Sequence, residues 1–384
     1  MATEAACLLI ADISGYTGYL AGVELDHAQD ILADLMGSIV GALRPGFRLA
    51  KLEGDAAFMY AVTDRIDGSL LLDTIEHCYF SFRRRRRDVR QATSCPCNAC
   101  TRIPELNLKF VVHHGTIIRQ QIAGLEELLG SDVIVAHRLL KNDVVAATGF
   151  DAYALLSQAC VDAMDVDVDA LGMQRSTATY EHIGEIGVWV HDLGRRWAEE
   201  EARTRVLVDA DQAIYELDTP LAASPSVVWE FVTAPGRRVG WQAGVTGVEV
   251  EAAGNRRGVG ATTHCMHGAQ ASIEELLDWR PFDYFTIRNS VPTPMGTIRM
   301  LMTVELEPTP GGTTLHQRMS APETAEERGI VEQMRPFLDA VSRTSGAQLA
   351  AQLEELQGQA GDAPAEPAPP EPRPGGPLGM TSQA

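Results

Sequence analysis

The sequence contains no apolar run of the ~20 residues that a helix needs to cross a bilayer, so it predicts no membrane span. No basic segment precedes the short apolar run after Glu4, so the N-terminus does not have the pattern of a secretory signal. Positive charge is scarce as well, since 32 Lys and Arg stand against 52 Asp and Glu. The resulting formal charge of −20 at pH 7 argues against general nucleic-acid binding, because it would repel phosphate backbones.

Cysteine is present, but not in the pattern of a disulfide scaffold. The seven cysteines are an odd number, and three of them cluster in residues 94–100 (SCPCNAC), which indicates a reducing compartment. Together with the missing leader and span, this predicts a cytoplasmic location. Apolar residues make up 45% and charged residues 22% of 384 positions, which is typical of a soluble globular protein with two domains.

Two stretches near the N-terminus each place an aspartate at a glycine-flanked turn beside an apolar strand. Residues 7–17 (CLLIADISGYT) contain Asp12, and residues 47–62 (FRLAKLEGDAAFMYAV) form a predicted hairpin with Asp55 at its turn. Two carboxylates placed in this way can converge on one hard cation, such as Mg²⁺ on a nucleotide phosphate. The structural alternative is that Asp12 caps the next helix and Asp55 serves the turn.

The order of these motifs resembles the catalytic domain of class III nucleotidyl cyclases. The likeness covers about residues 5–193 and includes ADISGYT, KLEGDAAF, VVHHGTI and GSDVIVAHRL. It implies an α+β fold, a ferredoxin-like α/β sandwich with a mixed sheet, in a domain of residues 1–195. It also implies a homodimer, because the sites of this family form between two subunits.

The resemblance implies a role for several individual residues. Asp12 and Asp55 would hold Mg²⁺ or Mn²⁺, the metals of a bound nucleoside triphosphate. Lys51 and Glu127 would read the adenine of ATP, and Arg138 would stabilise charge on the transferring phosphate. The implied reaction is attack of the ribose 3′-hydroxyl on the α-phosphate, which yields cyclic AMP and pyrophosphate.

Two positions depart from the family pattern. Ile134 stands where an asparagine steadies the ribose, and Glu185 aligns loosely with a phosphate-binding lysine, for which Arg195 or Arg196 could substitute. Losing one transition-state hydrogen bond typically costs about 10²-fold or more in rate. We therefore expect a domain that binds metal–nucleotide but is slow or inactive as a cyclase. The alternatives are an active adenylate cyclase and a non-catalytic carrier or scaffold.

The three clustered cysteines have two interpretations. Cys95, Cys97 and Cys100 could bind zinc or take part in redox chemistry, with Cys78 or a histidine as a fourth zinc ligand. The alternative is that they are reduced structural cysteines.

Two helices are also predicted in this region. One covers residues 70–89 and carries five arginines at 83–87, which we interpret mainly as a solvated surface, with phosphate or partner binding as the alternative. The other covers residues 153–165.

The second half of the chain has a different pattern. A charged linker helix at 196–205 precedes a region, 206–357, with a proline-started helix, several strands and a long final helix, 325–356, interrupted by a proline. With VVWEFVT, GVGA and ELLDWRPFDYF it resembles the START-like (SRPBCC) superfamily of polyketide-cyclase-like and lipid-transfer proteins. Residues 358–384 are rich in Pro, Gly and Ala and are predicted to be a disordered tail.

This second resemblance implies a helix-grip fold whose long helix closes an apolar cavity around a hydrophobic small molecule. The candidates for lining it are Trp229, Trp241, Met266, Trp279, Phe285 and Met300, each of which is also consistent with ordinary core packing. The whole sequence is thus interpreted as a signalling or regulatory protein in which a cyclase-like domain is coupled to a hydrophobic-ligand sensor.

Overall fold

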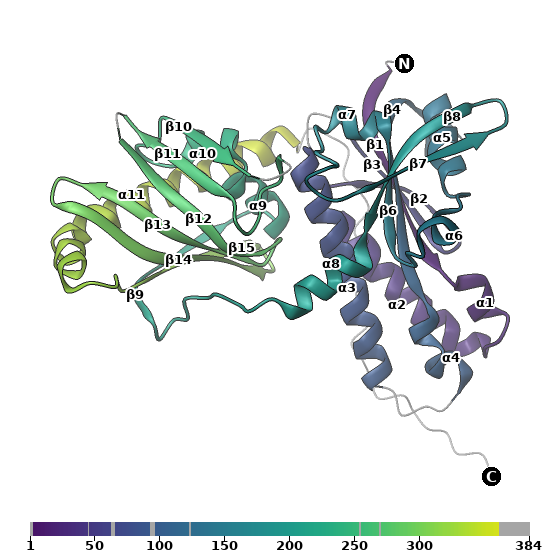
Figure 1. Cartoon of the computed structure of the whole chain (residues 1–384), viewed down its shortest axis with the longest axis horizontal. Coiled ribbons are helices and arrows are strands. Elements are labelled where there is room, and N and C mark those ends of the chain that lie inside the picture. The colour runs from purple at the N-terminus through teal and green to yellow at the C-terminus, as the bar shows by residue number, and fades with distance from the viewer. Residues whose placement is uncertain are drawn as a thin grey trace, which may run out of the picture.

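The computed structural model describes residues 3–44, 46–62, 66–92, 97–122, 124–252, 255–268 and 270–360. It consists of two β-sheets with their own helices, joined by helix α8 (Leu193–Ala202) (Figure 1). The α+β class is confirmed. Within the described residues, no helix combines the length and the apolar character needed to span a bilayer.

The first sheet has eight strands in the order β2-β3-β1-β4-β6-β8-β7, with β5 paired to β4. β4 and β6 are parallel and the other pairs are antiparallel, so the sheet is mixed, as predicted. The strands are β1 (Glu4–Ser14), β2 (Arg48–Glu53), β3 (Ala56–Val62), β4 (Asn107–Ile122), β5 (Leu125–Leu129), β6 (Tyr153–Ser157), β7 (Gln174–Tyr180) and β8 (Gly184–Asp192).

Helices cover both faces of this sheet. On β1 the odd-numbered residues from Cys7 to Ile13 belong to the core under α2 (Leu25–Leu43) and α3 (Gly68–Ala92), while Ala6, Leu8 and Ile10 face α5 (Ser131–Leu139), as the two-residue period of a strand requires. Asp12, the next even-numbered residue, lies on the same face of β1, toward α5. The smaller helices are α1 (Tyr16–Leu20), α4 (Asn98–Thr101), η2 (Ile103–Glu105), α6 (Val144–Thr148) and α7 (Gln158–Ala163).

The helix predicted at residues 153–165 is wrong. The chain forms the buried strand β6 and then the short helix α7, and β6 lies between β4 and β8. A strand that is buried on both faces is a short continuous apolar run, which periodicity does not distinguish from a helix.

The second sheet is fully antiparallel, in the order β10-β11-β12-β13-β14-β15-β9, and the long helix α11 packs on β9 and β14. This is the predicted helix-grip arrangement. Its strands are β9 (Ala213–Leu221), β10 (Gly247–Glu251), β11 (Thr262–His267), β12 (Gln270–Arg280), β13 (Tyr284–Thr293), β14 (Gly296–Thr309) and β15 (Gly312–Ser320). Its helices are α9 (Pro225–Thr233), α10 (Pro235–Trp241) and α11 (Ala325–Ala360).

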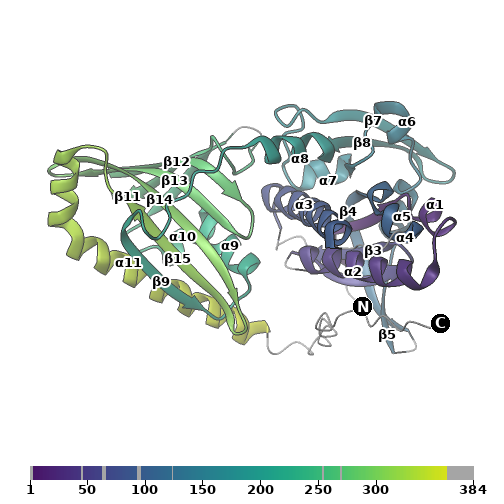
Figure 2. The ribbon, with the colours of Figure 1, turned by 90° about the horizontal axis from the view of Figure 1, so that it is seen from below.

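Helix α11 is longer than predicted. It continues through Pro336 to Ala360, so the first three residues of the predicted tail are helical, and residues 361–384 lie outside the described part of the chain. Figure 2 shows that α11 bends along its length. Proline inside a helix removes one backbone hydrogen bond and favours such a bend.

The charged linker forms α8, which packs on α3. Its Trp197 is only 7% exposed, and the guanidinium groups of Arg83 and Arg84 lie 5.3 and 5.7 Å from the centre of its ring. The interpretation of the arginine run as a solvated surface therefore fits Arg87, whose side chain is 55% exposed, but not the two arginines that hold α8.

Candidate functional site

The end of β1 and the β2–β3 turn bring Asp12 and Asp55 together. Asp12 lies opposite Ala56, and the Ile13 backbone N–H donates to the Asp55 carbonyl at 3.1 Å. Burial and then the negative charge of Asp12 raise the pKa of Asp55. The two carboxylates are thus close enough to repel one another, which is the arrangement that a shared divalent cation would relieve.

A third group, Lys109, was missed by the sequence reasoning. It lies directly opposite Asp12 on β4, and its Nζ is 2.9 Å from Asp12 Oδ2, with side-chain exposures of 21% and 17%. Although burial alone would lower the pKa of Lys109, the hydrogen bond and charge of Asp12 raise it. The only signal in the sequence was a lysine within an apolar strand, and naming its partner requires the register of β1 on β4.

Lys109 changes the electrostatics of the site. Its ammonium neutralises one of the two carboxylate charges, so a divalent cation has to bind beside a positive charge or displace it. The site is therefore weaker for metal than two unpaired carboxylates would be.

The predicted adenine-reading residues also lie together. Lys51 on β2 and Glu127 on β5 form an ion pair with Nζ 4.0 Å from Oε1, and their side chains are 53% and 36% exposed. An exposed pair at this distance contributes little to stability. Its significance is positional, because it shows Lys51 of β2 beside Glu127 of β5 at the exposed surface.

Arg138 lies on α5 beside a surface hollow of about 340 Å³, lined by Val133, Ile134, His137, Arg138 and Lys141. His137 Nε2 is 3.0 Å from Glu53 Oε2, which fixes this end of α5 next to the turn that carries Asp55. Ile134 is 57% exposed in the hollow and offers no hydrogen-bond donor. The structure therefore puts an apolar group where the family resemblance asks for an amide.

Both proposed substitutes for the phosphate-binding lysine already have partners, and their role stays a prediction. Arg196 donates from Nε to Glu76 Oε1 at 2.9 Å, and Arg195 pairs with Glu199 and donates to the Leu171 carbonyl at 3.2 Å. Glu185 is exposed in the β7–β8 hairpin.

The cysteine cluster is described only in part. Cys95 lies outside the described residues, Cys97 occupies the N-cap position of α4, and Cys100 is buried. Cys78 is in α3 and its Sγ is directed at the Ile39 carbonyl at 3.7 Å, while burial raises the pKa of its thiol. The zinc or redox site stays a prediction.

Two other clusters have the residue types of active sites. His113 lies 2.8 Å from Ser157 Oγ and 3.3 Å from Asp132, but Ser157 has 0% exposure and caps α7, so no substrate can reach it. Glu216, Asp218 and His316 are the one group of three metal-ligand types found close together in the described chain. Here both ring nitrogens of His316 already contact carboxylates, so we interpret the group as a surface ion-pair network.

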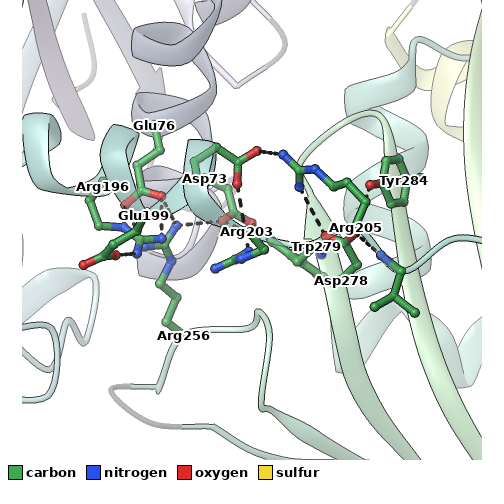
Figure 3. Close-up of polar contacts among 12 residues, drawn as sticks. Asp73, Glu76, Arg196, Glu199, Arg203, Arg205, Arg256, Asp278, Trp279 and Tyr284 are labelled. Carbon is green, nitrogen blue, oxygen red and sulfur yellow. Dashed lines mark hydrogen bonds and ion pairs between the residues drawn. The ribbon is translucent and has the colours of Figure 1, made fainter.

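The two domains meet on α3 through buried charges (Figure 3). Arg256, in the segment between β10 and β11, binds Glu76 at 2.8 and 2.7 Å and Asp73 at 3.1 Å. Although burial alone would raise the pKa of Glu76, Arg256, His191 and Arg196 hold it well below its usual range. Burial raises the pKa of Asp73 to about 6.

Aromatic side chains and apolar packing reinforce this interface. The Trp279 indole N–H donates to Asp73 at 3.2 Å, and His77 packs edge-on against Phe282 with ring centres 5.0 Å apart. One continuous apolar core contains side chains of both domains. The helix-grip domain is thus docked on the cyclase-like domain rather than tethered to it.

The predicted cavity residues do not surround a single cavity in this structure. Trp229, Trp279 and Phe285 pack on each other with ring centres 4.6 to 5.9 Å apart, and the Trp241 indole donates to the Phe231 carbonyl. Met266 is partly exposed on β11. Met300 lines a cavity of about 10 Å³ under α11, which is room for one water molecule.

Comparison with curated proteins gives one relative, and it is uncharacterized. The chain is 34% identical over 162 residues to "Uncharacterized protein Rv2561/Rv2562" of Mycobacterium tuberculosis, covering 42% of this chain and 73% of that protein. The chain belongs to the family of this uncharacterized protein. Two family models match parts of this chain. Residues 32–148 match "Protein of unknown function (DUF2652)", and residues 212–354 match "Polyketide cyclase / dehydrase and lipid transport".

Similar solved structures include two cyclases. The chain shares 15% identity with the guanylyl cyclase Cya2, covering 49% of this chain and 92% of that one at a TM-score of 0.37. It also shares 15% identity with the adenylyl cyclase CyaB from P. aeruginosa, covering 50% and 95% at a TM-score of 0.37. A third is protein MLL2253 from Mesorhizobium loti, at 16% identity, 35% and 95% coverage and a TM-score of 0.29. The START-like resemblance is confirmed by the family match over residues 212–354 and by the helix-grip fold, and the first half has the α+β fold with a mixed sheet that the cyclase-like resemblance implies.

Proposed function

We propose that this chain is a regulatory protein in which a cyclase-like domain binds a divalent cation with a nucleoside triphosphate, and a helix-grip domain senses a hydrophobic small molecule. The observation that supports the proposal is the placement of Asp12 beside the turn that carries Asp55: Asp12 pairs with Ala56, and the Ile13 N–H donates to the Asp55 carbonyl at 3.1 Å. Mg²⁺ or Mn²⁺ would lie between them, and Lys51 with Glu127 would contact the base of ATP.

The proposed domain turns nucleotide over slowly or not at all. Lys109 already pairs with Asp12, and Ile134 supplies no donor to the ribose. On α8, Arg196 is bonded to Glu76 and Arg195 pairs with Glu199. Arg138 and Lys141 line the hollow and are the cations there that could meet a phosphate. The residues proposed to hold the metal are thus present, whereas several groups that would position the substrate are missing. We therefore expect nucleotide binding without rapid catalysis.

Coupling between the domains is supported by the buried interface. Removing Arg256 would take the ion-pair partner from the buried Asp73 and one of two arginines from Glu76, so the two domains favour one mutual arrangement. A ligand that shifts the helix-grip domain would act directly on α3, which covers the sheet that carries Asp12.

A homodimer is part of the proposal. Large apolar side chains are exposed on β2, β4, β5 and α5, and exposed apolar surface is typical of association sites. They are Leu52, Ile122, Leu129 and Ile134.

The test is an incubation of the purified full chain with Mn²⁺ and ATP or GTP, scored separately for nucleotide binding and for cyclic product. The proposal expects saturable binding that Asp55→Ala abolishes and Asp88→Ala, an exposed aspartate on α3, leaves unchanged. Absence of Mn²⁺-dependent nucleotide binding by the unaltered chain would overturn it.

An active adenylate cyclase is the second candidate, and Arg138 beside the hollow favours it, because a cation placed at the transferring phosphate would stabilise the transition state. Cyclic AMP formation that requires Asp55 would select this candidate over the first.

A further inference from the structure

The interior of the helix-grip domain contains a row of side chains across four strands. Thr263, Glu274, Asn289 and Met300 are successive register partners on β11, β12, β13 and β14. Directly opposite residues of antiparallel strands project from the same face, with Cβ atoms about 5 Å apart. The face is the inner one, because Arg238 of α10 reaches Glu274, and Met300 packs in one cluster with residues of α11.

The one charged side chain of this row, Glu274, is neutralised by Arg238 of α10. Arg238 donates from both terminal nitrogens to the two Glu274 oxygens at 2.7 and 2.8 Å, with side-chain exposures of 11% and 5%. The Cys265 thiol adds a contact to Glu274 at 3.4 Å. The pair carries no net charge in a water-poor interior, so a further charge placed beside it would be uncompensated. A ligand end that fits here is uncharged.

Asn289 is different, because its carboxamide Oδ1 is buried and accepts no hydrogen bond from any described group. Nearly all buried polar side-chain atoms in native proteins have a partner, and an orphan loses its hydration without compensation. The Oδ1 atom lies on the face shared with Glu274 and Met300. A ligand that brings one hydrogen-bond donor to this atom would remove the deficit.

The remaining surroundings are apolar and adaptable. Ile298, Met300, Ile330 and Val331 form a core cluster separate from the main one, and methionine side chains repack easily around different shapes. The cavity of about 10 Å³ lies within this cluster, and its lining includes Arg335 and Leu338, which flank Pro336 of α11. Helix α11 lacks one backbone hydrogen bond at this proline, so this is the segment best suited to move aside for a larger molecule.

We propose that the helix-grip domain binds an uncharged amphiphilic alcohol, whose hydroxyl donates to Asn289 Oδ1 beside the Arg238–Glu274 pair. Its aliphatic body lies among the methionines under the Pro336 region of α11. The inference rests on the ligand-sensing half of the proposed function and adds the chemical class of the ligand.

The test compares 1-octanol with octanoate and octylammonium, which share one chain length and differ in the charge of the polar end. Binding to the full chain is measured by titration calorimetry. We expect 1-octanol to bind at least about tenfold more tightly than either ion, because each ion would have to be desolvated beside a neutral pair. Asn289→Leu should weaken 1-octanol binding about tenfold and leave octanoate, which has no hydrogen-bond donor, unchanged. Arg288→Leu, on the outward face of the same strand, is the matched control.

Thermal unfolding of the ligand-free variants gives a readout that a purely structural role would not produce. Asn289→Leu should keep or raise the midpoint, because it removes an orphan acceptor and adds apolar contact, although it weakens alcohol binding. A residue with only a structural role would lower the midpoint when substituted.

The outcomes separate the inference from the function on which it rests. Equal 1-octanol binding by the unaltered chain and Asn289→Leu, or equal binding of alcohol and octanoate, would overturn the inference and keep a hydrophobic-ligand domain. No binding of any of the three probes would overturn the inference and the sensing half of the proposed function together. Neither result would bear on the proposal that the first domain binds metal and nucleotide.

Discussion

Replacing Lys109 by methionine tests whether this lysine weakens a metal site. The Lys109 ammonium lies 2.9 Å from Asp12 Oδ2, and Mg²⁺ or Mn²⁺ binds carboxylate oxygen at about 2.1 Å, so a bound ion would lie about 5 Å from the ammonium. Even at the dielectric constant of water, the repulsion between charges of +2 and +1 at that distance is about 1.7 kcal/mol. Lys109→Met should therefore tighten Mn²⁺ binding at least about tenfold.

The assay is a Mn²⁺ titration of the full chain without nucleotide, followed by electron paramagnetic resonance of the free ion. Lys141→Met, which removes an exposed lysine beside α5, controls for the general loss of positive charge and should change the affinity little. Mn²⁺ binding that is unchanged or weaker in Lys109→Met would show that the lysine is not adjacent to a metal site, or that no site exists.

Three further predictions follow from the same contacts. The raised pKa of Asp55 means that the folded chain binds a proton there more tightly than the unfolded chain, so the free energy of unfolding falls as pH rises above the ordinary aspartate pKa. Asp55→Asn should therefore raise the thermal midpoint at pH 7 in metal-free buffer by about 1–2 °C. An unchanged or lower midpoint in calorimetry would contradict this. Arg256→Met should lower the free energy of unfolding, measured by chemical denaturation, by about 3–5 kcal/mol and split one unfolding transition into two. The control Arg288→Met, at an exposed ion pair, should lower it by less than about 1 kcal/mol, and equal effects of the two substitutions would refute a coupling role. If the cysteine cluster binds zinc, metal analysis of the purified chain should give about one zinc per chain, reduced in Cys97→Ser, and a zinc-free protein would leave only reduced structural cysteines.

The first domain could be predicted in outline because its signals are local. Apolar strands ending at Gly15 and Gly54 define the two turns that carry the aspartates, and both glycines have positive φ angles of 85° and 68°, which other residues rarely adopt. The strand at Tyr153–Ser157 was missed because five buried residues give no period. Sequence pattern thus located the carboxylates and misjudged one central strand.

The electrostatic partners could not be predicted, because they depend on register and docking. Lys109 meets Asp12 only through the pairing of β4 with β1, and Arg256 meets Glu76 across 180 positions of sequence. No composition or spacing rule links residues at such separations. The same reason explains Trp279, whose apolar character suggested a cavity wall but whose indole N–H faces Asp73 of the other domain.

Mn²⁺ affinity compared between the unaltered chain and Asp12→Asn, Asp55→Asn and the double variant measures the central claim most directly. If both carboxylates hold one ion, each single substitution should weaken binding by a similar large factor and the double substitution should add little, because the two act on one site. Binding that persists in the double variant, or an unaltered chain that binds no Mn²⁺, would contradict the account.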